Sequence, residues 1–192
     1  MAQRSVDDFL EAGLALLGEA GVGAMTIQAL CERLEVTKGS FYHHFRGGLP
    51  TYVERLLEYW ERVHSEQLIR TVGSVVPGQA RIQALTDVAV ALPHATEAAI
   101  RSWGRSEPAV ATVQRRVDDT RRTAIEATLR QLGMADDKAL VIAEIAIATL
   151  AGAQHLDTAR SLERLRAMFE EINRLIYVEA GMLSLAASAK DA

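Results

Sequence analysis

The sequence has 192 residues, enough for two compact parts. Its formal net charge of -4 excludes a chain that is coated in basic charge. The hydrophobic share is 49% and the aromatic share 5%, so the apolar content favours packed helices over strands. Cys31 is the single cysteine, which excludes an intramolecular disulfide and a cysteine-based zinc site.

Neither the N-terminus nor the most apolar run has the pattern of a targeting or membrane segment. Residues 5–23 are interrupted by acidic side chains before any apolar core forms, unlike a signal peptide. The run 139–153 carries Glu144 and is shorter than the roughly 20 residues that cross a bilayer. We expect a soluble, cytoplasmic protein.

The N-terminal residues have the pattern of three short helices. Ser5 and Asp8 have the spacing of a capping box at the start of the first helix. Thr26 is placed to cap a second helix, and Thr37 a third that runs to about Phe45. Two short helices joined by a tight turn, with another helix against them, are typical of a helix-turn-helix unit.

The rest of the chain also has helical patterns. Pro50 suits the first turn of a fourth helix, about 50–71, and GSVVPGQ at 73–79 is the best candidate for a connection between two parts of the chain. Later helices are expected at about 79–93, 95–104, 108–132, 136–154 and 158–180. The expected fold class is therefore all-α, with about nine helices.

The last two expected helices are the most apolar. The helix at 136–154 is apolar almost all round, and the helix at 158–180 has a wide apolar stripe. Because a helix that is apolar on every face must be buried on every face, we expect a second copy of the chain to cover them. The expected dimer interface consists of Ile142, Ile145, Thr149, Leu165, Phe169, Ile172 and Ile176.

Residues 36–48, VTKGSFYHHFRGG, combine basic and aromatic side chains in a stretch that has no Asp or Glu between Glu35 and Glu54. Lys38 can reach a phosphate or a guanine edge, and Gly39 is small enough to let the backbone enter a major groove. A solvated surface or tight internal packing would also account for these residue types. The expected DNA contacts are Thr26, Thr37, Lys38, Gly39, Ser40, Tyr42, His43 and Arg46; Phe41 and Phe45 should point inward, and His44 fits either role.

The segment MTIQALCERLEVTKGSFYHHFRG, residues 25–47, resembles the DNA-binding signature of the tetracycline-repressor (TetR) family. The likeness covers about residues 5–60 and is loose beyond them. It implies an all-α homodimer whose last two helices form a bundle between subunits. It also implies Tyr42 as a phosphate contact and a pocket for a small-molecule inducer among the middle helices. Where many members of the family have an Asn-Lys pair, this sequence has Gly47 and Gly48.

With this resemblance, the expected domains are a helix-turn-helix DNA-binding domain at 1–50 and a ligand-binding and dimerisation domain at 51–192, linked by the fourth helix. An apolar or aromatic inducer is favoured by the Ala-rich middle helices. No cofactor, metal or catalytic residue is expected. The pocket candidates are Trp60, His64, His94, Trp103 and His155, each of which is also compatible with a core or interface position.

The function that these patterns favour is a one-component transcriptional regulator. We expect a repressor that binds a palindromic operator as a dimer and is released by its inducer. An enzyme is the first alternative, but the sequence has no nucleophile elbow, no Gly-rich phosphate loop and no His-Glu-x-x-His spacing. A helical homodimer that binds a protein partner without sequence-specific DNA binding is the second.

Overall fold

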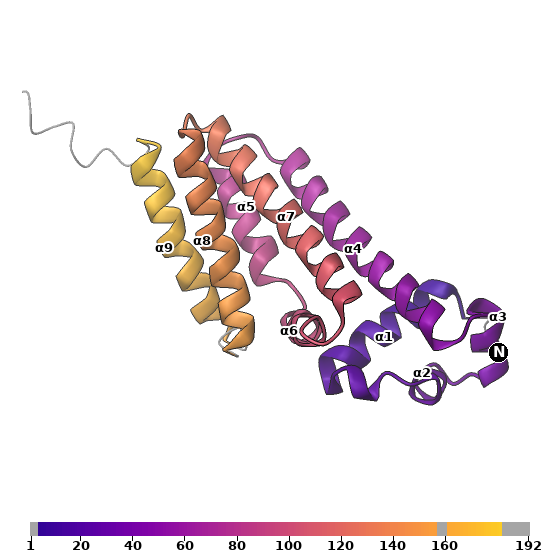
Figure 1. Ribbon diagram of the computed structural model, residues 1–192. Helices are drawn as coiled ribbons and strands as arrows, with labels where there is room; N and C mark the ends of the chain where they lie inside the picture. Colours follow the sequence, from indigo (N-terminus) through magenta and orange to yellow (C-terminus); the bar gives the residue numbers. More distant parts are fainter. Residues whose placement is uncertain (1–3, 157–160, 182–192) are drawn as a thin grey trace, which may run out of the picture. The chain divides into compact units, whose positions relative to one another are not determined.

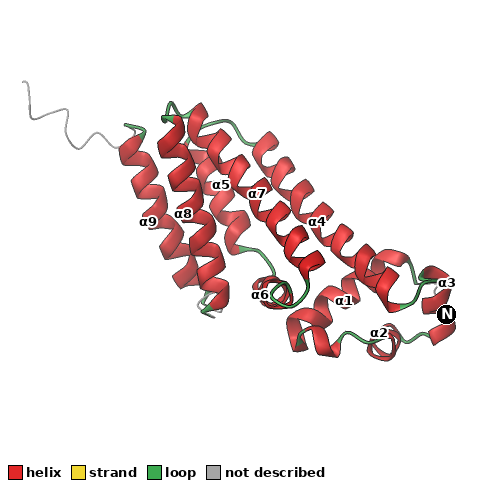
Figure 2. Ribbon diagram, in the orientation of Figure 1, coloured by secondary structure: helices red, strands yellow, loops and turns green. Residues whose placement is uncertain are grey.

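The computed structural model describes residues 4–156 and 161–181, and every regular element within these residues is helical (Figures 1 and 2). The expected all-α class and helix order are confirmed, whereas the expected start of the last helix at 158 lies outside the described residues. The elements are α1 (Val6–Ala20), the 3-10 helix η1 (Val22–Ala24), α2 (Ile27–Leu34), α3 (Lys38–His44), α4 (Leu49–Ser74), α5 (Gln79–Val90), α6 (His94–Trp103), α7 (Pro108–Gln131), α8 (Asp136–His155) and α9 (Leu162–Glu179).

The first helices begin at the caps that the sequence predicts. The N–H of Asp8 donates to the Ser5 hydroxyl at 3.1 Å, and the N–H of Ser5 donates to the Asp8 carboxylate at 2.6 Å. The hydroxyl of Thr26 accepts a backbone N–H of α2 at 3.1 Å, and that of Thr37 accepts one of α3 at 3.4 Å. Each cap therefore satisfies a donor that the helix leaves unpaired.

The chain divides into two compact units, each with a core of its own. The first unit runs to His64 and also includes Pro93–Val117. Its centre is aromatic: the rings of Phe9 and Phe45 meet edge to face with centroids 5.7 Å apart, and the hydroxyl of Tyr52 donates to the backbone oxygen of Phe9 at 2.8 Å. This core holds α3 against α1 and the start of α4.

Helix α6 joins the first unit by packing along α1. The hydroxyl of Thr96 donates to the backbone oxygen of Leu14 at 3.1 Å, and Gly18 lies where the two helices come closest. The next residue, Glu97, contacts α4 instead: its carboxylate lies 3.5 Å from Nε2 of His64, and both side chains are buried. Two neighbouring residues of α6 therefore bind two different helices.

The second unit comprises Ser65–Leu92 and the described residues from Asp118 onward. Helices α8 and α9 pack side by side (Figure 1), and α5 packs on α9. Apolar side chains fill the space between them, and Asn173 of α9 donates a buried hydrogen bond to the hydroxyl of Thr86 in α5 at 3.0 Å. A buried polar pair of this kind fixes how α9 is rotated against α5, because any other rotation would leave both groups unsatisfied.

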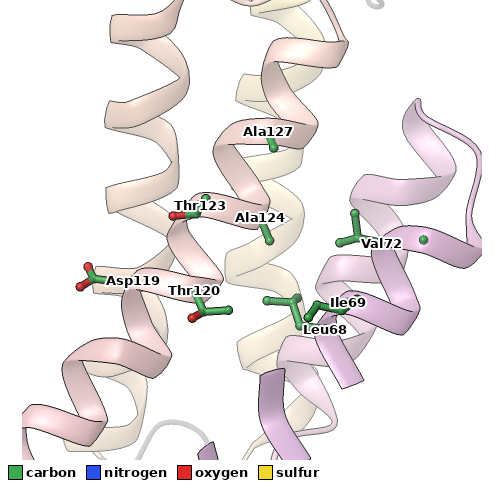
Figure 3. Close-up of a pocket in the computed structure, with 9 residues that line it drawn as sticks. Leu68, Ile69, Val72, Asp119, Thr120, Thr123, Ala124 and Ala127 are labelled. Carbon is green, nitrogen blue, oxygen red and sulfur yellow. The ribbon is translucent and has the colours of Figure 1, made fainter. Parts of the chain in front are cut away.

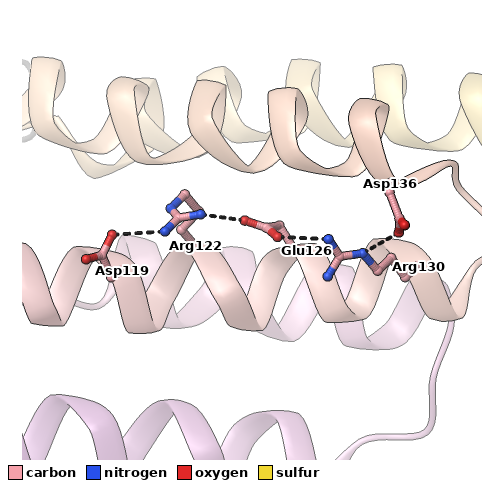
Figure 4. Close-up of polar contacts among 5 residues, drawn as sticks. All are labelled: Asp119, Arg122, Glu126, Arg130 and Asp136. Atoms are coloured by element: carbon pink, nitrogen blue, oxygen red, sulfur yellow. Dashed lines mark hydrogen bonds and ion pairs between the residues drawn. The ribbon is translucent and has the colours of Figure 1, made fainter.

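A chain of ion pairs runs along α7 and ends on α8 (Figure 4). Arg122 donates to Asp119 at 3.0 Å and to Glu126 at 2.9 Å, while Arg130 donates to Glu126 at 3.1 Å and to Asp136 at 2.7 Å. Single exposed pairs contribute little, but linked pairs hold one another in place. This ion-pair chain ties the end of α7 to the first turn of α8.

The compact units do not end where the sequence suggests a functional boundary. The first unit extends past the expected limit at residue 50 and takes in α6 and the start of α7. The limits 1–50 and 51–192 for DNA-binding and ligand-binding domains stay a prediction. Within the ranges that the structure describes, no helix is long and apolar enough to cross a membrane.

Candidate nucleic-acid interface and ligand groove

Helix α3 has one buried face and one exposed face. Phe41 and Phe45 are fully buried in the first unit, which places them inward as expected. Lys38, Tyr42 and His43 lie on the exposed side, and Tyr42 keeps 49% of its surface in solvent. A large aromatic ring held outside the core is available to a partner, and it stands here beside a lysine and a histidine.

Gly39 has no structural reason inside the chain to be a glycine. A Cβ atom built on it would meet only the Thr37 hydroxyl, at 3.5 Å, which is an ordinary contact. Tight internal packing therefore does not account for the small residue. What the glycine does is leave the backbone of α3 open on its exposed side, as close approach to a DNA groove requires.

The remaining expected DNA contacts surround this face. Thr26 and Thr37 are exposed while they cap α2 and α3, so each hydroxyl serves its helix and also meets solvent. Arg46 is exposed directly after the helix, and Ser40 is half-buried. His44, which fitted either role, packs inward: its Nε2 lies 3.0 Å from the backbone oxygen of Arg4.

Gly47 and Gly48 form the turn between α3 and α4. Gly48 has φ of 73°, a left-handed conformation that strains any other residue, and its oxygen accepts the N–H of Tyr52 at 3.1 Å. A Cβ on Gly47 would lie 2.0 Å from the Thr51 hydroxyl. The glycines thus have a structural role, and since Pro50 lacks an N–H, the start of α4 offers fewer donors to a phosphate.

Cys31 lies beneath this surface. Its thiol donates to the backbone oxygen of Thr37 at 3.6 Å, which links α2 to the cap of α3. Burial raises the pKa of the Cys31 thiol, because a buried thiolate loses its hydration. The cysteine is a packing residue of the helix-turn-helix, and its thiol stays neutral near pH 7.

The second unit has an open groove of about 610 Å³ between the end of α4 and the middle of α7 (Figure 3). Figure 3 shows the α4 side chains pointing toward the small side chains of α7. The lining residues are Leu68, Ile69, Val72 and Gly73 of α4, and Asp119, Thr120, Thr123, Ala124 and Ala127 of α7.

The pocket residues that the sequence suggests do not line this groove. Trp60 and His64 are buried in the first unit with ring centroids 5.3 Å apart, and His94 and Trp103 lie half-buried at opposite ends of α6. His155 is exposed at the end of α8. Polar-tipped aromatic residues do not mark the groove, because its lining is mostly aliphatic side chains and threonines. The spacing of small residues on α7, at 120, 123, 124 and 127, was the available signal.

Helices α8 and α9 each have an inner and an outer apolar face. Most of the expected dimer contacts are on the inner face, buried within the same chain, where little surface is left for a partner: Ile142, Leu165, Phe169, Ile172 and Ile176. Thr149 is half-buried, and Ile145 is 42% exposed. Among the described residues, large apolar side chains that stay exposed on the side away from this core are Val141 and Ile145 of α8 and Leu175 and Val178 of α9, here called the outer face.

Among the described residues, no three His, Cys, Asp or Glu side chains are grouped as metal ligands. What the described residues do present is a set of exposed basic and aromatic groups on α3, a mostly aliphatic groove, and an apolar outer face.

Comparison with known proteins agrees with this arrangement. Residues 9–47 match the family model described as bacterial regulatory proteins, tetR family. Comparison with curated protein sequences finds no match.

Solved structures with the same fold span almost the whole chain. A transcriptional regulator from Rhodococcus has 20% identity and a TM-score of 0.69, covering 91% of this chain and 97% of its own. A TetR transcription regulator from Haloarcula marismortui has 17% identity and a TM-score of 0.73, covering 88% and 96%. A TetR transcriptional regulator from Legionella pneumophila has 16% identity and a TM-score of 0.72, covering 91% and 96%.

Proposed function

We propose that this chain is a TetR-family one-component repressor, released from a palindromic operator by a small-molecule inducer; the match of residues 9–47 to the tetR family model and the shared fold support this. The observation that carries this proposal is the exposed face of α3. Lys38, Tyr42 and His43 stand in solvent there beside the open backbone of Gly39, over a stretch without acidic residues. That is a surface suited to a polyanion.

Each exposed residue has a role in this proposal. Lys38 neutralises a phosphate and releases the counterions condensed on it, or bonds a guanine edge. The hydroxyl of Tyr42 and the ring of His43 bond phosphates at the groove wall. Ser40 bonds a base edge, because Gly39 has no side chain and lets the backbone of α3 approach the bases closely. Thr26, Thr37 and Arg46 bond phosphates at the rim.

The repressor acts as a homodimer. A single recognition module buries only about 600–1,000 Å² on DNA, so two modules on two half-sites are needed for tight specific binding. The outer face of α8 and α9 supplies the surface for self-association: Val141 and Ile145 on α8, and Leu175 and Val178 on α9, are about half exposed. Covering such side chains is the main driving force of stable dimers.

The groove is the inducer site in this proposal. Helix α4 starts one turn after α3, and its last turns line the groove, so one helix is shared by the DNA-contacting part and the ligand-contacting part. A ligand that binds better to the form with wrongly spaced α3 helices weakens operator binding. A coupling of about 1–3 kcal/mol corresponds to roughly 5–150-fold.

The test is operator binding as a function of salt. The protein is titrated against the DNA upstream of its own gene and its neighbours. Lys38→Ala is compared with Lys138→Ala, which removes an exposed lysine of α8. We expect saturable binding to one palindromic fragment, with a salt slope that Lys38→Ala lowers by about one and Lys138→Ala leaves unchanged. If no fragment binds better than random DNA, the operator function is wrong and the protein-partner alternative takes its place.

A further inference from the structure

Both α4 and α7 contribute aliphatic side chains to the lining of the groove in the second unit. On the α4 side Leu68 is buried, while Ile69 is 66% exposed and forms part of the rim. On the α7 side Ala124 and Ala127 contribute only methyl groups, which is why the space is not filled by side chains. The volume of about 610 Å³ lies within the roughly 300–1,000 Å³ of typical small-molecule sites.

The lining residues provide no partner for a ligand charge. None of them is a lysine, arginine or histidine, so an anionic group would find no cation. The one charged lining residue, Asp119, already accepts a bond from Arg122 at 3.0 Å, and its carboxylate points away from α4 in Figure 3. The carboxylate of Asp119 is thus already ion-paired and 65% exposed to water, so it gives a ligand ammonium inside the groove little stabilisation. The neutral polar groups of the lining are the hydroxyls of Thr120 and Thr123.

Transfer of an ionised group out of water without a partner is costly, whereas transfer of apolar surface is favourable. From these groups we propose that the groove, as the inducer site of the function proposed above, takes an uncharged, hydrocarbon-rich molecule with at most a hydroxyl or carbonyl group. The groove rejects a carboxylate or an ammonium compound whose hydrocarbon chain is as long as that of the uncharged ligand.

The test is direct ligand binding without DNA. The uncharged fluorescent probe N-phenyl-1-naphthylamine is bound to the full chain and displaced by 1-dodecanol, dodecanoate or dodecylammonium at pH 7, with the alcohol below its solubility limit and each ion below its micelle concentration. We expect the alcohol to displace the probe at a concentration about tenfold or more below that of either ion, a difference of about 1.4 kcal/mol or more. If either ion displaces the probe as well as the alcohol does, the proposed ligand class is wrong.

Two variants test the location. Ala127→Leu fills the groove, and Ala109→Leu places the same side chain at an exposed position of α7 outside it. We expect Ala127→Leu to weaken probe binding about tenfold or more and Ala109→Leu to leave it unchanged. Ala124→Leu is the second filling variant in case Ala127→Leu alters the helical circular dichroism. Unchanged probe affinity in a folded filling variant overturns the site.

Operator binding separates the two proposals. If the alcohol is selected at the groove and also weakens binding to the operator, both hold. If it is selected at the groove but leaves operator binding unchanged, the ligand class holds and release by a groove ligand is wrong.

Discussion

Thr96 in α6 donates a hydrogen bond to the backbone oxygen of Leu14 in α1 at 3.1 Å, which joins residues 82 positions apart in the chain. One turn farther along α1, Gly18 allows the backbones to approach: a Cβ there would lie 2.6 Å from the Thr96 hydroxyl and 3.2 Å from its backbone nitrogen. This close approach makes α6 part of the first unit.

Gly18→Ala is expected to destabilise the protein. The added methyl group overlaps Thr96, and because one neighbouring atom belongs to the backbone, α6 itself must shift. Overpacking of this kind costs about 1–3 kcal/mol, which a urea unfolding curve resolves as a lower midpoint.

Gly39→Ala is the matched control, because its new methyl group meets only an ordinary contact. Its unfolding midpoint should stay equal or rise, while operator affinity falls because the methyl group stands on the exposed face of α3. An unchanged midpoint in Gly18→Ala would contradict the close packing of α1 and α6.

The buried pair His64 and Glu97 predicts a second stability effect. Glu97 is fully buried 3.5 Å from Nε2 of His64, so Glu97→Ala leaves a buried polar ring that has lost one of its partners. Removal of one partner of a buried polar contact costs about 1–3 kcal/mol, whereas replacement of both partners by apolar residues of similar shape can be nearly neutral. We expect His64→Leu/Glu97→Leu to recover much of the loss in thermal unfolding. If the double variant lost as much stability as His64→Leu and Glu97→Leu lose together as single variants, the two side chains would not be coupled.

Charge substitutions on α8 and α9 separate the outer face from the inner face. Ile145 is 42% exposed, so Ile145→Glu should leave the chain folded and shift sedimentation toward the monomer. Ile172 is 7% exposed within the core, so Ile172→Glu should unfold it.

Val76→Glu is the control for charge alone, since Val76 is 78% exposed on the α4–α5 connection. The molecular mass of Val76→Glu in sedimentation should match that of the wild type, because its self-association is unchanged. A dimer that persists in Ile145→Glu at micromolar concentration would contradict self-association through the outer face.

The capping box of α1 predicts a loss of stability in acid. The backbone N–H of Ser5, and then its hydroxyl, hold the pKa of Asp8 below its usual range. A carboxyl whose pKa is lower in the folded state stabilises the fold above the unfolded value, near 3.9, and this contribution is lost as the pH falls through the folded value.

Asp8→Asn should therefore be less stable than the wild type near pH 7 and close to it near pH 2, with the difference disappearing below about pH 4. Unfolding curves at several pH values measure this. A difference that stayed constant with pH would mean that the carboxylate charge has no part in the cap.

The N-terminal part of the fold was predictable because its signals are local. Ser5, Thr26 and Thr37 act on donors within three residues, and Phe41 and Phe45 share a face by their spacing. The groove and the outer face were not predictable from the sequence, because they depend on which side of each helix is covered by another helix. The pattern of α9 shows that Phe169 and Ile172 are apolar, but only the fold shows that α5 and α8 bury them within the chain.

The first unit is discontinuous in sequence, since it draws on the chain up to His64 and again on Pro93–Val117. A chimera that transplants only the N-terminal residues onto another protein of this fold would separate α1 from Thr96 and His64 from Glu97. Exchange of DNA specificity between such proteins therefore calls for a two-segment graft. Alternatively, the recipient must have an α6 that presents a hydrogen-bond donor to α1 and an acid to α4.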